Sequence, residues 1–284
     1  MATEALTTTV LAGGLAFGEG PRWHERKLWV SDMHANRVVT VDADGKVERV
    51  VRVAGRPSGL GWLPDDRMLI VSMSEKKLLR YDGRSIETHA DLSEHAPNEI
   101  NDLVVDTAGR AYVSQFGFDF WNGGEFAKTA IVMVEPDGRV RVAAEDLAFP
   151  NGMVITPDGK TLVVAESYAA RLTAFDVAAD GTLGNRRVFA KLEGAVPDGI
   201  CLDAEGCVWV ASPVSNECLR VREGGEVAAR VKTETQSIAC MLGGSDRKTL
   251  YVLTAETTEP DESVKKRSAR VETVKVDVPG AGLP

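Results

Sequence analysis

The sequence predicts an all-β fold, a six-bladed β-propeller with four strands in each blade. A short strand pattern recurs six times: two apolar or aromatic residues, Val, and in most copies a small and then a polar residue. Successive copies lie about 40 to 50 residues apart, a spacing typical of propeller blades. No helical period of 3.6 residues is sustained anywhere in the chain. The six copies are 28–32, 69–73, 111–115, 162–166, 208–212 and 250–254.

Each copy belongs to a unit of about four strands. A shorter apolar strand and a turn rich in Asp, Gly and Pro precede the copy, as in NGMVITPDGKTLVVAE (151–166). A further strand and an acidic-glycine turn follow it, as in IVMVEPDGRVRVA (131–143). Such turns are typical of β-hairpins. Six units account for nearly the whole chain, so we expect residues 1–284 to form one propeller domain.

The chain ends are expected to close the ring. TTTVL (7–11) precedes the first complete blade and reads as a spare strand for the last blade, which would protect two sheet edges. SARVETVKVDV (268–278) alternates and is expected to supply the remaining strands of that blade. The charged stretch 256–270, which connects the strand pattern at 250–254 to this C-terminal segment, is expected to be a solvated loop.

Composition limits the partners and the compartment. The net charge is −9, which argues against nucleic acid and anionic membrane because both need a positive face. No signal peptide and no apolar run of about 18 residues is evident. The four cysteines form no Cys-x-x-Cys pair and read as reduced thiols of a cytoplasmic protein, with a Cys201–Cys207 disulfide as the alternative. A monomer and a homodimer both remain open.

One polar residue stands at the start of the innermost strand of every blade. Since the innermost strands surround the propeller axis, side chains at equivalent starts are expected to converge there. Turn formation explains an Asp or Asn before Gly at any single site, but not one register in four blades. The six residues are Glu19, Ser58, Asn101, Asn151, Asp198 and Ser237.

The four large members of this set are oxygen donors. Two carboxylates, Glu19 and Asp198, would repel each other unless a cation lay between them. Asn101 and Asn151 add carbonyl oxygens without adding charge, and no His or Cys joins them. An incomplete all-oxygen shell suits Ca²⁺, with Mg²⁺, Mn²⁺ or Zn²⁺ as alternatives. We therefore expect Glu19, Asn101, Asn151 and Asp198 to be metal ligands.

The segment 115–130, QFGFDFWNGGEFAKTA, makes the longest interval between two repeats. Long loops in compact folds are frequently functional, although aromatic packing between blades is the competing interpretation. As an apolar lid over the metal it would favour acyl, aryl or lipid-like substrates. Phe118 and Trp121 are its candidate substrate-binding residues.

At these residues the sequence resembles the SMP-30/gluconolactonase (regucalcin-like) family of six-bladed propellers. The resemblance runs along nearly the full chain and is strongest in GEGPRWHERKLWVSD (18–32), NDLVVDTAGRAYVS (101–114), PNGMVITPDGKTLVVAES (150–167) and PDGICLDAEGCVWVA (197–211). It implies metal ligation by Glu19, Asn151 and Asp198, with Asn101 contacting metal or substrate. It also implies hydrolysis of lactones, and the metal set is similar to that of a calcium-dependent diisopropylfluorophosphatase.

One departure from the family concerns the substrate. Sugar-lactone members carry an Arg two residues before the ND motif, where the present chain has Glu99. A carboxylate cannot replace the forked donor of an arginine. Glu99 is therefore a candidate substrate-binding residue for a less hydroxylated or differently charged ester, alongside Asn101.

The reaction expected is attack of water on a carbonyl. The metal would polarise the carbonyl, and Asp198 would act as general base or, alternatively, as a covalent nucleophile. The four histidines lie outside the inner-strand starts and read as loop or surface residues, so no Ser-His-Asp set is apparent. The alternatives are a non-enzymatic calcium-binding or regulatory propeller, an organophosphate hydrolase, a protein-interaction propeller and a strictosidine-synthase-like enzyme.

Overall fold

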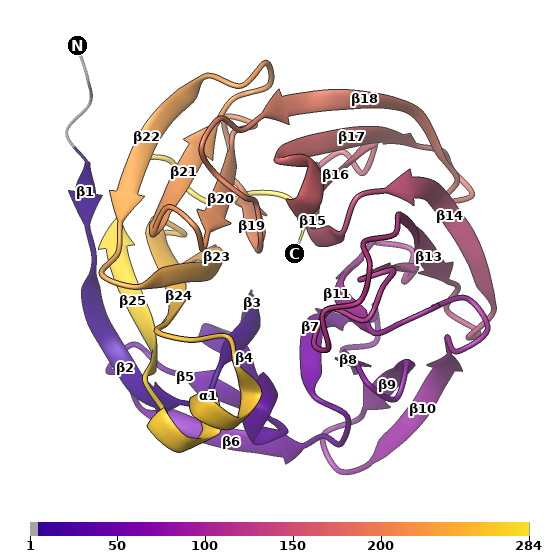
Figure 1. Cartoon of the computed structure of the whole chain (residues 1–284), viewed down its shortest axis with the longest axis horizontal. Helices are drawn as coiled ribbons and strands as arrows, with labels where there is room; N and C mark the ends of the chain where they lie inside the picture. The colour runs from indigo at the N-terminus through magenta and orange to yellow at the C-terminus, as the bar shows by residue number, and fades with distance from the viewer. Residues whose placement is uncertain (1–4, 284) are drawn as a thin grey trace.

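A computed structural model of the chain describes residues 5–283. Its strands form six sheets arranged as a ring, and consecutive strands of a sheet are hydrogen-bonded neighbours, apart from the N-terminal strands added to the last two sheets (Figure 1). This confirms the predicted six-bladed propeller of four-stranded blades.

The first three blades run from Gly18 to Leu147. Blade 1 contains β3 (Gly18–His24), β4 (Lys27–Asp32), β5 (Arg37–Val41) and β6 (Val47–Arg52). Blade 2 contains β7 (Pro57–Trp62), β8 (Met68–Ser72), β9 (Lys77–Tyr81) and β10 (Ile86–Asp91). Blade 3 contains β11 (Ile100–Val105), β12 (Ala111–Gln115), β13 (Thr129–Val134) and β14 (Val140–Leu147).

The last three blades complete the ring. Blade 4 contains β15 (Pro150–Ile155), β16 (Thr161–Glu166), β17 (Arg171–Val177) and β18 (Leu183–Lys191). Blade 5 contains β19 (Ile200–Leu202), β20 (Val208–Ser212), β21 (Glu217–Val221) and β22 (Val227–Lys232). Blade 6 contains β23 (Gln236–Gly243), β24 (Thr249–Ala255) and β25 (Ala269–Lys275) from the C-terminal part. The recurring five-residue pattern corresponds to the second strand of each blade, whose apolar residues are buried between neighbouring sheets.

The N-terminal segment closes the ring as expected and extends one strand further. β2 (Thr9–Leu15) pairs antiparallel with β25 and forms the outermost strand of blade 6. The short β1 (Leu6–Thr7) pairs in parallel with β22 and so adds a fifth strand to blade 5. The N-terminus therefore ties two blades together on the outside of the ring (Figure 1).

The prediction of a solvated loop over 256–270 is wrong in its central part, which forms helix α1 (Pro260–Lys266). Pro260 opens the helix, acidic residues fill its first turn and lysines its last turn, all of which favour a helix. Seven residues are too few to show a helical period. Two 3₁₀ turns, η1 (Met33–Ala35) and η2 (Ser167–Ala169), follow the second strands of blades 1 and 4.

The C-terminal tail crosses the axis at the far ends of the inner strands. Ala281 N–H donates to the Leu202 carbonyl at 3.0 Å, and Leu283 N–H donates to the Ile155 carbonyl at 2.9 Å. Leu202 and Ile155 are the last residues of β19 and β15, so the tail links blades 5 and 4 opposite the inner-strand starts. Figure 1 shows the C-terminus inside the ring. No described helix is long and apolar enough to span a membrane.

Two of the inner strands begin next to a buried carboxylate that anchors the chain. The Glu166 carboxylate is fully buried, accepts a hydrogen bond from Ala148 N–H at 2.9 Å and pairs with the guanidinium groups of Arg171 and Arg186. Asp32 occupies the same place in blade 1, where it accepts from Ala16 N–H and pairs with Arg37. These contacts fix the backbone just before β15 and β3.

Glu166→Gln is expected to destabilise the fold by about 1–3 kcal/mol at neutral pH. Burial opposes ionisation of Glu166, but hydrogen bonds from Thr173, Ala148 and Arg171 outweigh it and lower the pKa of this carboxyl. Because the pKa is lower in the folded state, this stabilisation is present above the unfolded pKa and is lost as pH falls through the folded pKa. Urea midpoints at pH 3 to 7 measure it: the wild-type stability should fall more steeply on acidification than that of the variant, and parallel profiles would contradict the assignment.

Candidate functional site

The four expected ligand residues lie together at the axis. Glu19, Asn101, Asn151 and Asp198 line one cavity of about 90 Å³. Since liquid water occupies about 30 Å³ per molecule, this cavity has room for a few waters. The other residues that line it are Phe17, Met33, Phe116, Phe120, Trp121, Phe149 and Thr258.

Local irregularities of the inner strands bring these residues to the axis. The pairing of the first and second strands shifts register just after Glu19, and the same shift follows Ile100 and Pro150. A shift of this kind re-aims a side chain that regular alternation would direct into the sheet. Asp198 instead lies two residues before the short strand β19.

The glycine that follows most of these polar residues has a packing role. A Cβ on Gly20 would lie 2.4 Å from the Ser58 carbonyl oxygen, and one on Gly199 would lie 2.4 Å from Ala239 Cβ. Gly152 faces the backbone of Ile200 in the same way. The inner strands of adjacent blades therefore approach too closely for a side chain, and the polar–Gly dipeptides are ring-packing elements as well as turn formers.

Hydrogen bonds connect three of the blades around the cavity. Ser58 Oγ donates to Asn101 Oδ1 at 3.2 Å, and Asn101 Nδ2 donates to Asn151 Oδ1 at 3.0 Å. Glu19 Oε2 accepts from Gly20 N–H at 3.0 Å. Ser237, the sixth residue of the set, is directed elsewhere and shares a hydrogen bond with Thr233.

The two carboxylates are short of positive partners. Burial raises the pKa of Glu19 well above its usual range, and the charges of Asp198 and Asp102 raise it further. Burial raises the pKa of Asp198 to about 8, with the Asn151 amide offsetting part of the rise. Asp198 Oδ1 is enclosed and has no hydrogen-bond partner among the described residues. Two under-neutralised carboxylates with an orphaned acceptor are a set that a divalent cation fits.

The donor set has two carboxylates and two carboxamides. Within residues 5–283, no group of three or more His, Cys, Asp or Glu side chains is placed to hold a metal ion. Any cation at the axis must therefore draw on the amide oxygens of Asn101 and Asn151 in addition to Glu19 and Asp198. Ligation by these four residues remains a prediction.

A buried ion pair lies beside the cavity and was not predicted. Arg22 donates to Asp102 Oδ1 at 2.8 Å, and both side chains are at least nine-tenths buried. Arg22 also donates to the carbonyls of Leu60 and Leu103, so one guanidinium links the inner strands of blades 1, 2 and 3. Asp102 occupies the place where four other blades have glycine, which is the sequence signal that singles it out.

The aromatic loop covers the cavity, as the lid interpretation expects, and also packs between blades. Trp121 lines the cavity, but Phe118 does not and instead packs against Phe120, Phe126 and Phe149 with ring centroids 5.7 to 6.3 Å apart. Direct substrate binding by Trp121 thus has geometric support, whereas Phe118 lies behind the lining residues.

Glu99 does not line the cavity. One of its carboxylate oxygens pairs with Arg56, and the other accepts a hydrogen bond from Trp121 Nε1 at 2.7 Å. Sequence reasoning missed Arg56 because it lies on the connection between blades 1 and 2, far from the ND motif along the chain.

His34 lies on the connection between β4 and β5, as the expectation of loop or surface histidines allows, but it is not at the surface. It is buried on η1 with its ring 5.0 Å from that of Phe17 and 5.7 Å from that of Trp121. Its Nε2–H donates to the Thr258 carbonyl at 3.3 Å. Burial lowers the pKa of His34 to about 4, so the ring is neutral at pH 7.

The four cysteines are buried and unpaired, and the alternative of a Cys201–Cys207 disulfide is not realised. Cys201 lies opposite Trp209 in the hairpin and approaches Cys240 of blade 6, with the two sulfurs 3.9 Å apart.

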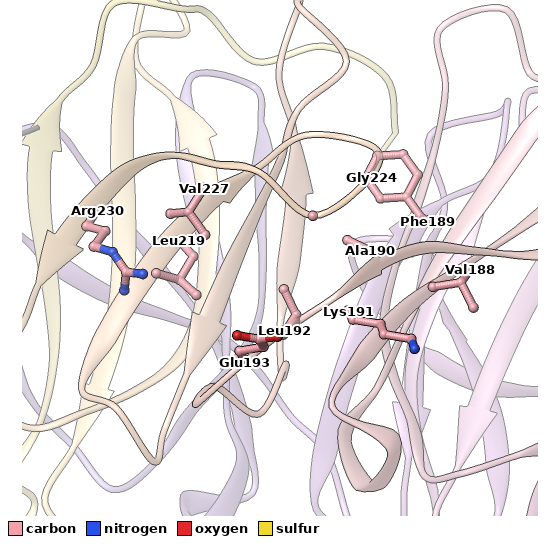
Figure 2. Close-up of a pocket in the computed structure, with 11 residues that line it drawn as sticks. Val188, Phe189, Ala190, Lys191, Leu192, Glu193, Leu219, Gly224, Val227 and Arg230 are labelled. Carbon is pink, nitrogen blue, oxygen red and sulfur yellow. The ribbon is translucent and has the colours of Figure 1, made fainter. Parts of the chain in front are cut away.

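A larger cavity, of about 770 Å³, lies away from the axis between β18 and the β21–β22 hairpin (Figure 2). Its lining mixes aliphatic side chains such as Val188, Leu219 and Val227 with the charged residues Lys191, Glu193 and Arg230. Figure 2 shows these charged groups spread along the groove rather than gathered. The groove contains no constellation comparable with the ring at the axis.

Several known proteins are similar in sequence to this chain. Residues 17–256 match the family described as SMP-30/Gluconolactonase/LRE-like region. Regucalcin of Danio rerio is 30% identical over 71% of this chain and 70% of its own length. Pentonolactonase XacC of Haloferax volcanii is 27% identical over 98% of this chain and 96% of its own length.

Solved structures show the same fold. A calcium-binding regucalcin of Agrobacterium tumefaciens superposes with a TM-score of 0.82 at 23% identity, over 100% of this chain and 99% of that one. A gluconolactonase of Xanthomonas campestris gives a TM-score of 0.76 at 24% identity, over 96% and 89% of the two chains. The match across most of the chain, with these relatives, shows that the protein belongs to the SMP-30/gluconolactonase/LRE-like family.

Proposed function

We propose that this protein is a lactonase that uses a divalent cation, most favourably Ca²⁺, to hydrolyse a lactone or a related small ester. The observation that carries the proposal is the convergence of two carboxylates and two carboxamides on one cavity beneath an apolar lid. The names of the relatives, a pentonolactonase and a gluconolactonase, support the same reaction class. The free cysteines support work in a reducing compartment, such as the cytoplasm.

The residues that would hold the cation are Glu19, Asn101, Asn151 and Asp198. When bound, such a cation polarises a carbonyl oxygen as a Lewis acid. The chain's own contribution begins with position: the register shifts and glycine contacts hold four oxygen donors at one point before any substrate arrives.

Asp198 is the proposed general base. Asp198 lines the cavity, and no residue among 5–283 donates a hydrogen bond to its Oδ1, so the carboxylate keeps an unused acceptor for the proton of the attacking water. The water oxygen bonds to the carbonyl carbon, the acyl–oxygen bond of the lactone breaks, and the proton held by Asp198 passes to the departing alkoxide. Covalent attack by Asp198 is the competing route, and ¹⁸O from labelled water in the Asp198 carboxylate after a single turnover would establish it.

Glu19→Gln is expected to weaken Ca²⁺ binding roughly 10-fold or more, because it removes one of two ligand charges. Isothermal calorimetry of both proteins measures the affinity. Glu25→Gln, a change at an exposed turn of the same blade, is the matched control and should leave the affinity unchanged. Equal affinity in wild type and Glu19→Gln would count against ligation by Glu19.

A calcium-binding role without turnover is the second candidate function. The regucalcin of Agrobacterium tumefaciens is described as a calcium-binding protein, and its fold is shared here. This candidate predicts thermal stabilisation by Ca²⁺ with no hydrolysis across a panel of lactones, aryl esters and organophosphates. Turnover of any member that stops with a chelator and returns with Ca²⁺ favours the hydrolase, and the preferred member separates a lactonase from an organophosphatase.

A further inference from the structure

Three side chains form a closed set of polar contacts, and one of them, Trp121, lines the cavity. Trp121 Nε1–H donates to Glu99 Oε2 at 2.7 Å, and the Arg56 guanidinium pairs with the other oxygen of Glu99. The Arg56 guanidinium carbon also lies 4.9 Å from the centroid of the Trp121 ring. We refer to Arg56, Glu99 and Trp121 as the rim clamp.

The backbone holds two members of the clamp in place. Arg56 N–H donates to Asn36 Oδ1 at 3.1 Å, which ties it to the end of η1. The Glu99 carbonyl accepts from Phe116 N–H at 2.9 Å. Trp121, in contrast, belongs to the strand-free segment between β12 and β13, and the bond to Glu99 is the polar contact of its side chain. Glu99 therefore fixes the indole N–H, while the ring itself packs against Phe120 and His34.

The clamp leaves an apolar entrance above the four expected metal ligands. The charge of Arg56 is neutralised by Glu99, both oxygens of Glu99 are occupied, and the indole N–H is satisfied. The side chains of Arg56 and Glu99 are only 21% and 12% exposed. What faces the cavity is the Trp121 ring, together with Phe17, Met33, Phe116, Phe120 and Phe149.

We propose that the rim clamp is the specificity determinant of this site: it selects lactones or esters with an alkyl or aryl substituent and rejects polyhydroxylated ones. This inference rests on the proposed hydrolase function. A hydroxyl group placed against these apolar side chains, rather than beside Thr258 or the four oxygen donors, would lose its hydrogen bonds to water without gaining a partner, at a cost of roughly 10-fold in affinity for each buried group. An alkyl or aryl group would instead replace water against the aromatic faces.

Glu99→Leu tests the clamp, because it releases both the indole and a guanidinium of unopposed charge. Two non-hydrolysable lactams serve as binding probes in calorimetry with Ca²⁺ present: a 6-alkyl-piperidin-2-one and glucono-δ-lactam. The matching lactones report kcat and KM. We expect the wild type to bind the alkyl lactam at least 100-fold more tightly than glucono-δ-lactam. In Glu99→Leu the affinity for the alkyl lactam should fall about 10-fold, and the affinity for glucono-δ-lactam should rise. In the variant, KM should rise for the alkyl lactone and fall for the hydroxylated lactone, and kcat should change less than KM.

Three further variants define the cause. Glu87→Leu removes the partner of Arg80 at an exposed pair of blade 2 and should leave both preferences as in wild type. The double variant Arg56→Leu, Glu99→Leu should lose the gain on the hydroxylated probe, since the released guanidinium is gone. Glu99→Gln retains an acceptor for the indole and serves if Glu99→Leu does not fold; it should reduce the preference for the alkyl probe by a smaller factor.

The outcomes separate the clamp from the reaction. If Glu99→Leu changes the lactam affinities as expected but no lactone is hydrolysed, the clamp proposal stands and the hydrolase proposal is rejected. Hydrolysis with the same alkyl-to-hydroxylated ratio in wild type and Glu99→Leu would overturn the clamp and retain the hydrolase. A wild type that binds glucono-δ-lactam as tightly as the alkyl lactam also overturns the clamp.

Discussion

Replacing Asp198 with Asn is expected to lower kcat for lactone hydrolysis by about 10²- to 10⁴-fold, the range attributed to a positioned general base. Asn is nearly isosteric but cannot accept and carry the proton that water must lose. Asp198 lines the cavity and its Oδ1 has no hydrogen-bond partner among the described residues, whereas the other carboxylate of the cavity, Glu19, already accepts a hydrogen bond from Gly20 N–H. Steady-state rates at saturating Ca²⁺ separate loss of the base from loss of metal affinity.

The matched control is Asp180→Asn, which makes the same chemical change in an exposed turn of blade 4. It should retain wild-type kcat. A circular dichroism melt of Asp198→Asn should show an intact fold. If Asp198→Asn, loaded with Ca²⁺, hydrolyses its best substrate within a few-fold of the wild-type rate, Asp198 is not the base.

The largest expected stability effect comes from Asp102→Ala. Removing one partner of a buried pair leaves an uncompensated charge and typically costs about 3–5 kcal/mol. Arg22 is enclosed with only 4% of its side chain exposed, and Asp102 is its one charged partner among the described residues. The free energy of unfolding from urea titrations should fall by this amount, and the melting temperature should drop by about 10 °C.

Asp137→Ala is the comparison for that variant. Asp137 pairs with Arg139 at the surface, with side chains 56% and 78% exposed, and such pairs contribute about 0–1 kcal/mol. Asp102→Asn, which retains an acceptor for Arg22, should lie between the two. A loss below about 1 kcal/mol for Asp102→Ala would mean that Arg22 finds other partners and that the pair does not hold the three inner strands together.

The ring of polar residues was predictable because a propeller converts sequence register into spatial position. Glu19, Asn101 and Asn151 occupy one register in three blades, and the fold brings that register to the axis. Asp198 joins them although β19 starts only at Ile200, two residues after it. The second strands could also be predicted from the sequence, because each blade buries most of this strand and so repeats the same apolar pattern.

Contacts between loops of different blades were not predictable in this way. The pairing of Arg56 with Glu99 depends on how two connections meet in space, and no spacing in the chain encodes that. Asp102 carried a usable signal, a charged residue at a glycine position, but its partner Arg22 carried none. Helix α1 is too short for periodicity to reveal, although its charges follow the helix dipole.

The most direct test of the account is a crystal structure with Ca²⁺ supplied. We expect a single anomalous peak in the axial cavity, with oxygens of Glu19, Asn101, Asn151 and Asp198 at about 2.3–2.6 Å from it. Only water in that cavity at saturating Ca²⁺, or a cation bound by other side chains, would contradict the central claim that these four residues form one metal site.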